Sequence, residues 1–394
     1  MKISDIIGGT KRRKPRHDRN YRIKQQDLFT ISGKDLNEDN AARIQHLEDL
    51  ILWNGSAGAA KALATLHQIE SNPQSVTIKW DGSPAIIFGR NENGEFVLTD
   101  KSGFGAKKYN GRVTSAQDLE KMLVVRGEEN DPKRAAFAKS MRNIWDKIES
   151  NVPADFRGYV HGDLLYFTTP KNQDGKYIFQ PNTTQYAVDA NSDIGKQIAA
   201  SDVGVVIHKA IDLDGNVSDV DMSKFQGGRT LIMPPATVTT PPGVDLPAVG
   251  KLDEYLKNNA ASIDRLFSVP AELKMSDFAN ILYTYINSAV KTGKLAKLGN
   301  DFAEWVQSAK ISEPKKKRLL QWVSDNAEGF NATFTFIKAI KQIKNQVIAA
   351  LDNQPADIQA STAGQPGGEG YVVDKDVKLV NRAGFTAANL ARER

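Results

Sequence analysis

Hydrophobic residues recur at spacings of three and four between Asn37 and about Ile69, which predicts helical structure. A Gly-Ser-Ala-Gly sequence at 55–58 interrupts this pattern, so two short helices are expected there. From about Ser75 the period changes, and runs rich in β-branched residues alternate with Asp/Asn/Gly turns. A charged segment at 115–150 again has helical spacing. The expected strands are 76–80, 85–89, 96–99, 158–167, 177–179, 185–188 and 203–209.

The second half of the chain is divided by two linker-like compositions. A Pro/Thr-rich segment at 233–250 predicts a stiff linker, and residues 251–352 have helical periodicity with room for about five helices. A Gln/Ala/Pro/Gly-rich segment at 353–366 predicts a second linker. Strand character returns at 369–373 and 377–380. The fold class expected is therefore α+β, an antiparallel-sheet domain at 37–232 and 367–394 with an all-helical insertion.

The composition excludes several kinds of catalytic and metal-binding site. The 394 residues include no cysteine and five histidines, so thiolate nucleophiles and Cys-based metal sites are excluded, and any metal would be a hard ion on oxygen ligands. No apolar run reaches the roughly 18 residues of a membrane span, and no secretory signal is evident, so we expect no membrane partner and a cytoplasmic protein.

The net charge of +5 is concentrated in the N-terminal arm, residues 1–36. Residues 11–24 hold eight Lys/Arg and one acid, which gives +7 for this segment and −2 for all other residues. Such an arm can bind phosphates through counterion release. It can equally be a solvated tail that only aids solubility, and the sequence leaves both interpretations open.

Four residues with catalytic potential lie at or near expected strands. Lys79 ends a strand before an Asp-Gly turn, and a lysine there can act as a nucleophile once it is neutral. Asp163 and Glu369 place carboxylates within apolar surroundings, and Lys378 adds a cation in another apolar strand. Together they suit Mg²⁺-assisted attack on a nucleoside triphosphate. Each residue taken alone is also compatible with a purely structural role.

These residues stand in an order that resembles a known superfamily. Lys79-Trp-Asp-Gly-Ser83, His161-Gly-Asp163, Glu369-Gly-Tyr-Val-Val373 and Lys378-Leu-Val380 resemble motifs I, III, IV and V of the covalent nucleotidyltransferases. That superfamily comprises ATP-dependent DNA and RNA ligases and mRNA capping enzymes. The wording of motifs I and IV is most similar to the phage-type RNA ligases.

The resemblance implies a role for each matching position. Lys79 would attack the α-phosphate of ATP and form lysyl–AMP, with Mg²⁺ or Mn²⁺ offsetting the phosphate charge. Asp81 and Gly82 would shape the pocket, and Lys101 would lie in the Lys/Ser/Gly segment that follows motif I. The further implied roles are ribose contact and metal binding for Asp163, metal binding for Glu369, and neutralisation of the α-phosphate for Lys378.

Departures from the family pattern qualify these implications. The second lysine of motif V is replaced by Val380, and Arg382 is a candidate substitute. The aromatic residue that stacks on adenine is not evident, which leaves His208 or Phe385 as stand-ins. No oligonucleotide-binding barrel is expected after motif V. The helical insertion is the candidate replacement, through a Lys/Arg cluster at 310–318 beside two tryptophans, although these residues also fit a solvated helix start and a helical core.

The resemblance implies an ATP-dependent polynucleotide ligase that joins the ends of nucleic acid strands, RNA rather than DNA. It also implies a cytoplasmic protein of a bacterium, or of a phage that acts in the cytoplasm of its host. Two alternatives remain open: a nucleotidyltransferase that modifies a protein, a small molecule or an RNA 5′ end, and a non-catalytic binding protein on a degenerate ligase-like domain. The sequence decides neither ATP against GTP nor the oligomeric state.

Overall fold

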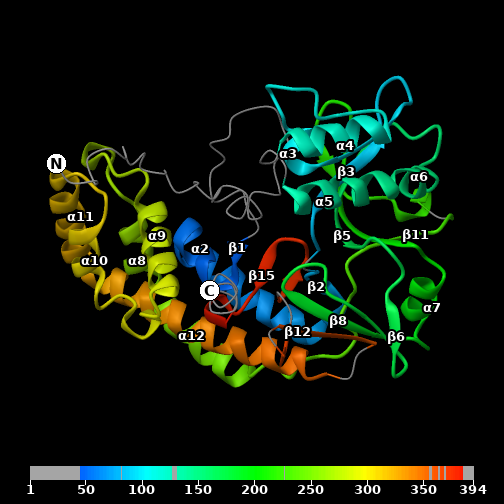
Figure 1. The fold of residues 1–394 in the computed structure, drawn as a ribbon. Coiled ribbons are helices and arrows are strands. Elements are labelled where there is room, and N and C mark those ends of the chain that lie inside the picture. Colours follow the sequence, from blue (N-terminus) through cyan, green and yellow to red (C-terminus); the bar gives the residue numbers. More distant parts are fainter. Residues whose placement is uncertain are drawn as a thin grey trace, which may run out of the picture.

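The structure is a computed structural model that describes residues 45–80, 82–126, 131–225, 227–354, 357–362, 364–367 and 370–384. It is a mixed α+β fold with sheets that are mainly antiparallel, as the alternation of periodicities predicts. The helices of the second half of the chain gather on one side of the molecule, and the larger sheets lie on the other side together with the remaining shorter helices (Figure 1). The long helix α12 (Ala327–Asp352) extends from the helical side toward the sheets.

Sheet A is the small central sheet. Its strand order is β1-β15-β14-β2, with β1 parallel to β15 and the other pairs antiparallel. One face is hydrophobic, because Val76, Tyr371, Val373, Val377 and Leu379 all point into the main core. The strands are β1 (Gln45–His46), β2 (Val76–Ile78), β14 (Tyr371–Val373) and β15 (Val377–Leu379).

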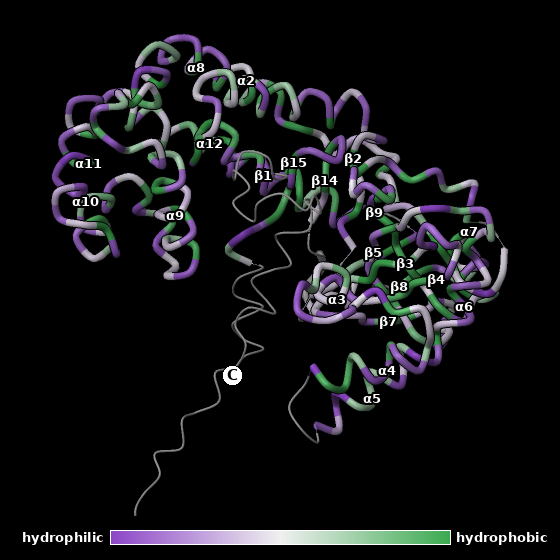
Figure 2. Tube along the Cα trace, turned by 90° about the horizontal axis from the view of Figure 1, so that it is seen from above, coloured by the Kyte–Doolittle hydropathy of each residue, from purple (hydrophilic) through white to green (hydrophobic). Residues whose placement is uncertain are grey.

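Sheet B is covered on one face by helices. Ile86, Leu98 and Val160 point from alternate strand positions toward Leu119 and Met141 of these helices. The strands of this sheet are strongly hydrophobic along their length (Figure 2). The strand order is β10 (Val217–Ser218), β9 (Val203–Ile211), β5 (Gly158–Tyr166), β3 (Ala85–Arg90) and β4 (Phe96–Asp100), with β11 (Thr230–Met233) parallel to β9; the helices are α4 (Ala116–Val125), α5 (Pro132–Asn143) and α6 (Trp145–Glu149).

Sheet C contains a strand at a position where the composition predicts a linker. Residues Ile358–Thr362 form β12, which lies between β13 and β8, and the alternation of Ile358 and Ala360 with polar residues fits a strand. The linker prediction for 353–366 is therefore wrong over this strand. The order is β13 (Gln365–Pro366), β12, β8 (Thr184–Asp189), β7 (Lys176–Phe179) and β6 (Lys171–Gln173), with α7 (Asp193–Ala199) beside it.

The helices of the expected insertion share one core with α2 (Leu50–Ser71) and sheet A. Leu66, Ile337 and Leu379 belong to the same buried cluster, so a boundary in composition is not a boundary in packing. The helix α2 kinks at Asn54–Gly55, close to the expected break. The other helices on this side are α8 (Leu246–Phe267), α9 (Phe278–Lys291), α10 (Phe302–Ser308) and α11 (Glu313–Asp325), with 3₁₀ turns η4 (Leu47–Asp49), η5 (Pro73–Ser75), η6 (Met222–Phe225), η7 (Ala271–Leu273) and η8 (Leu295–Lys297) across the fold.

The Pro/Thr-rich segment also belongs to the fold. The Ile78 amide donates to the Ala236 carbonyl at 2.7 Å, and the Val238 amide donates to the Val76 carbonyl at 2.8 Å. The segment thus covers the outer edge of β2, a position at which proline is tolerated. No helix in the described ranges is long and apolar enough to cross a lipid bilayer.

Candidate functional site

Lys79 lies directly after β2, at one end of sheet A. Its backbone amide donates to the Gly370 carbonyl at 2.9 Å, which joins it to the segment that leads into β14. A Cβ atom on Gly370 would come within 2.2 Å of the Leu379 carbonyl, so only glycine fits where these strands approach. The backbone around Lys79 is therefore fixed by residues that lie nearly 300 positions later in the chain.

The strand register places Lys79 and Lys378 on one face of sheet A. Thr77 pairs with Val372, Val372 pairs with Lys378, and Lys378 pairs with His46. Directly paired residues share a face, so Thr77, Lys378 and His46 lie together. Lys79, directly after β2, is near enough to this face for its charge to lower the pKa of His46. The opposite face is the hydrophobic one, so the two lysines predicted from the sequence converge on the polar face of the sheet.

His46 is a member of this face that the sequence analysis missed. Burial lowers the pKa of His46 well below its usual value, and four nearby cations lower it further. The cations, from the largest effect to the smallest, are Arg382, Lys344, Lys378 and Lys79. The imidazole is therefore neutral at physiological pH, and its buried Nδ1 atom has no hydrogen-bond partner among the residues that the structure describes. A lone histidine before a hydrophobic run gave no signal of this position.

The loop that follows Lys79 rests on the strand of Asp163. A Cβ atom on Gly82 would lie 2.3 Å from Asp163 Cβ and 3.0 Å from the Leu164 carbonyl, so the backbone approach requires glycine. The Ser83 amide donates to the same Leu164 carbonyl at 2.9 Å. Gly82 thus shapes the site by joining the Lys79 segment to sheet B.

Asp163 meets His208 across sheet B. The His208 Nε2 atom lies 3.1 Å from Asp163 Oδ2, and both side chains are partly buried. A register shift between His161 and Gly162 leaves His208 as the extra residue of β9, because His161 pairs with Lys209 and Gly162 with Ile207. Such bulges redirect a side chain, here toward the carboxylate. The sequence gave no sign of this bulge.

His161 and Lys101 complete the cluster on this face. The rings of His161 and His208 lie 5.9 Å apart between centroids. Burial lowers the pKa of His161 to about 3, the charges of His208 and Lys101 lower it, and Asp163 opposes them. Lys101 begins α3 (Lys101–Phe104), which Asp100 caps. The structure therefore brings together Lys101, Asp163 and His208, as predicted sites, with His161, which was quoted only as part of a motif.

Arg382 belongs to a buried ion network. Its guanidinium donates to both carboxylate oxygens of Asp49 at 2.8 and 2.9 Å and to Asn287 Oδ1 at 2.6 Å. Lys344 donates to both oxygens of Glu48 and to the Val380 carbonyl, each at 2.7 Å. These contacts hold η4 and α9 together, and they disfavour the prediction that Arg382 replaces the second lysine of motif V.

The basic cluster of the helical region is also largely structural. Lys315 pairs with Asp277 at 2.7 Å, and the buried Lys316 donates to the Gln307 carbonyl at 2.7 Å. Trp322 donates to the Leu266 carbonyl at 3.0 Å, and Trp305 packs against the main core. Of the two interpretations of this segment, the structure supports the helical core and leaves little of the cluster for nucleic acid.

Several predicted positions lie outside the described residues. These are Asp81, Glu369, Phe385 and the basic arm at 1–36. Within the described part of the chain, no three His, Asp or Glu side chains are arranged to hold a metal ion by themselves. Mg²⁺ is commonly bound by one or two carboxylates together with phosphate oxygens of a nucleotide, and Asp163 fits such a partial donor set.

Comparison with known proteins identifies a family. Residues 41–394 match the model of a family described as a family of unknown function, DUF6267, and the chain belongs to this family. No curated protein and no solved structure matches the chain.

Proposed function

We propose that this member of the DUF6267 family is an ATP-dependent covalent nucleotidyltransferase whose nucleophile is Lys79, and that it acts as a polynucleotide ligase, on RNA rather than DNA. The observation that carries the proposal is the convergence of Lys79 and Lys378 on the polar face of sheet A, beside a loop that rests on Asp163. Two lysines held by different strands suit the capture of a phosphate group between them.

The chemistry of the first step follows from this arrangement. The neutral amine of Lys79 attacks the α-phosphorus of ATP, a P–N bond forms, and the P–O bond to the β-phosphate breaks with release of pyrophosphate. A second cation beside a nucleophilic lysine favours the neutral amine and offsets negative charge on the phosphate. We assign both effects to Lys378, and His46 adds no charge because it stays neutral.

The residues on sheet B suit the nucleoside part of the substrate. Asp163 accepts hydrogen bonds, and the ring of His208 is oriented by its contact with Asp163. Bound Mg²⁺ would offset charge on the triphosphate, with Asp163 as a donor and Glu369 as the further carboxylate. In later steps AMP passes from Lys79 to a 5′-phosphate, and a 3′-hydroxyl attacks this activated end with release of AMP.

The test is covalent labelling. The full chain is incubated with α-³²P-ATP or α-³²P-GTP and Mg²⁺, after treatment with pyrophosphate to remove any bound AMP, and is then run on a denaturing gel. We expect a labelled band that is absent in Lys79→Ala and present in Lys107→Ala, an exposed lysine elsewhere in the chain. Chase of the labelled protein with 5′-phosphorylated RNA, DNA or no nucleic acid identifies the acceptor.

A non-catalytic nucleotide-binding protein is the second candidate. It is favoured by one observation, the replacement of the second motif V lysine by Val380 while Arg382 is engaged with Asp49. Nucleotide binding measured by calorimetry without any covalent label after pyrophosphate treatment would support this candidate and exclude the enzyme.

A further inference from the structure

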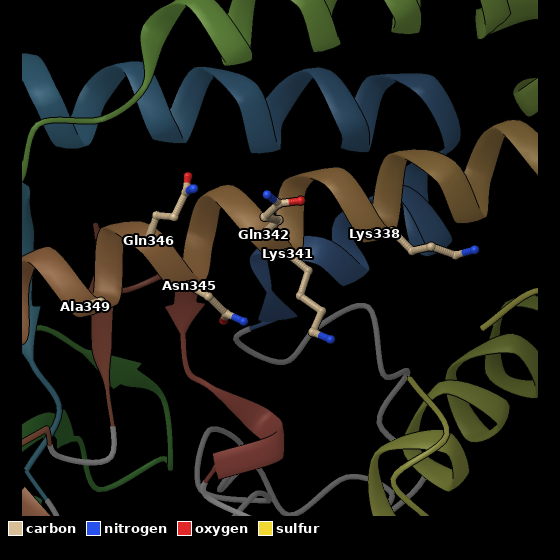
Figure 3. A pocket seen from close by; sticks show the side chains of 6 residues that line it. All are labelled: Lys338, Lys341, Gln342, Asn345, Gln346 and Ala349. Carbon is tan, nitrogen blue, oxygen red and sulfur yellow. The ribbon is translucent and has the colours of Figure 1, made fainter. Parts of the chain in front are cut away.

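A polar groove runs along one side of α12. It encloses about 410 Å³ and is lined by Lys338, Lys341, Gln342, Asn345, Gln346 and Ala349. These positions recur at intervals of one, three and four residues, so they form one continuous helical face. Figure 3 shows Lys341 and Asn345 pointing to the same side of the helix, with Gln342 and Gln346 along the other margin.

Between its two ends, helix α12 carries charged residues of one sign only. Between Glu328 and Asp352 the sequence of α12 contains three lysines and no acidic residue. Lys344 turns inward and is neutralised by Glu48, whereas Lys338 is exposed and Lys341 is half-buried in the groove. Among the described residues that line the groove there are two lysines and no carboxylate, so the wall formed by α12 is positively charged.

The amide groups indicate the kind of ligand. Asn345 Oδ1 is buried and has no hydrogen-bond partner within the described part of the chain, so a ligand donor that enters the groove can pair with it. Gln342 and Gln346 can each donate and accept. Ala349 is the only apolar residue among the described residues of the lining, so the wall formed by α12 offers none of the aromatic or large aliphatic anchors on which protein partners depend.

The groove is connected to the candidate site. Lys344, one residue before Asn345, donates to the Val380 carbonyl just after β15, the strand that carries Lys378. Burial lowers the pKa of Lys341, and the charges of Lys344 and Arg382 lower it further while Glu48 opposes them. The same two cations act on His46, and both are paired with carboxylates of η4, so the groove is joined to the candidate site by these contacts and not by net positive charge.

We propose that this groove on α12 binds the sugar–phosphate backbone of single-stranded nucleic acid, with the two lysines on phosphates and the amides on sugar or base groups. From Lys338 to Ala349 the helix spans about 16 Å at 1.5 Å per residue. That length corresponds to about five nucleotides of a stacked strand at roughly 3.4 Å per phosphate. The role of the strand as acceptor of AMP rests on the proposed function, whereas its binding does not.

Binding is tested with the full chain and a fluorescein-labelled 15-nucleotide single strand, as RNA and as DNA of one sequence, by anisotropy over a series of salt concentrations. We expect Lys338→Ala/Lys341→Ala to weaken binding at least tenfold and to reduce the slope of log K against log salt by about 1.4, since a single strand contributes about 0.7 per phosphate contact. Asn345→Asp, which is nearly isosteric but negative, should weaken binding in the same direction.

The matched control is Lys133→Ala/Lys139→Ala, which removes two exposed lysines of α5, outside the groove and outside the basic cluster at 310–318, and should leave the affinity unchanged. Two results for the wild type support nucleic acid binding in the groove. One is equal affinity for RNA and DNA, and the other is a preference for RNA that the Asn345→Ala variant loses. Wild-type affinity in the groove variants, no binding of either strand, or equal competition by poly-glutamate of the same charge overturns it.

The labelling experiment separates this inference from the proposed function. If the protein binds the strand through the groove but forms no adduct on Lys79, the groove proposal stands and the nucleotidyltransferase proposal is refuted. A protein that forms the adduct while its groove variants bind normally refutes the groove alone.

Discussion

Two groups of cations meet near β15, and they differ in what surrounds them. Lys344 and Arg382 are buried, with exposed side-chain fractions of 1 % and 8 %, and each is paired with a carboxylate of η4. Lys79 and Lys378 are partly exposed and converge on the polar face of sheet A. Buried charge pairs specify how segments dock, whereas we propose that the partly exposed lysines act on an anionic substrate.

Replacement of the buried Lys344 is expected to have the largest effect on stability. Replacement by alanine leaves Glu48 buried without its partner, and we expect a loss of about 3–5 kcal/mol in the free energy of unfolding. Urea denaturation followed by tryptophan fluorescence measures the change. Lys338→Ala, at an exposed position of the same helix, should stay within about 0.5 kcal/mol of the wild type. Equal losses in both variants would contradict the structural role of the network.

Lys378→Ala should affect the rate of labelling strongly and the stability little, the reverse of what is expected for Lys344→Ala. Loss of a cation that stabilises the transition state lowers the rate of labelling by roughly 10²–10³, about 2.7–4 kcal/mol of activation energy, with little change in unfolding. The control is Lys375→Ala, a lysine of the preceding turn that pairs on the surface with Asp219. A rate of labelling in Lys378→Ala that matches this control would remove Lys378 from the site.

His46 links the two groups and predicts a pH dependence of stability. Its folded pKa lies well below the unfolded value of about 6.5, so the unfolded chain binds more protons and stability falls as the pH falls from about 6.5. The loss approaches about 1.4 kcal/mol per pH unit for this residue. Urea titrations at pH 7, 6 and 5 should show a shallower dependence in His46→Gln. The exposed His67→Gln variant should follow the wild type.

The smallest effect is expected at Lys315. Its ion pair with Asp277 is partly exposed, so Lys315→Ala should cost less than about 1 kcal/mol of unfolding free energy. We also expect no change in affinity for single-stranded RNA, because the amine is engaged with Asp277. A large loss of RNA affinity would show that the basic cluster of α11 forms a nucleic acid surface after all.

Local pattern predicted the elements well, because each depends on neighbouring residues. Strands expected at 85–89 and 96–99 appear as β3 and β4 with ends shifted by at most one residue. The Pro/Thr-rich segment and residues 358–362 were taken for linkers, although both pair with strands that are distant in sequence. Composition carries no information about such pairing.

The candidate site shows the same limit. The motif residues Lys79 and Lys378 were found from sequence and lie on one face, but their neighbour His46 was not found. The sequence suggested Arg382 as a phosphate-binding residue, because nothing near it in sequence reveals its contact with Asp49, which lies 333 residues away. Likewise the bulge that turns His208 toward Asp163 depends on the partner strand.

The position of β14 between β2 and β15 has a consequence during protein synthesis. Lys79 is made early, yet its strand has no partner in sheet A until residues 371–379 leave the ribosome. Contacts of such sequence separation form late in folding. A nascent chain, or one cut by a protease before β14, would therefore contain Lys79 without the opposing Lys378. Adduct formation should thus report that translation has passed the last strands of sheet A.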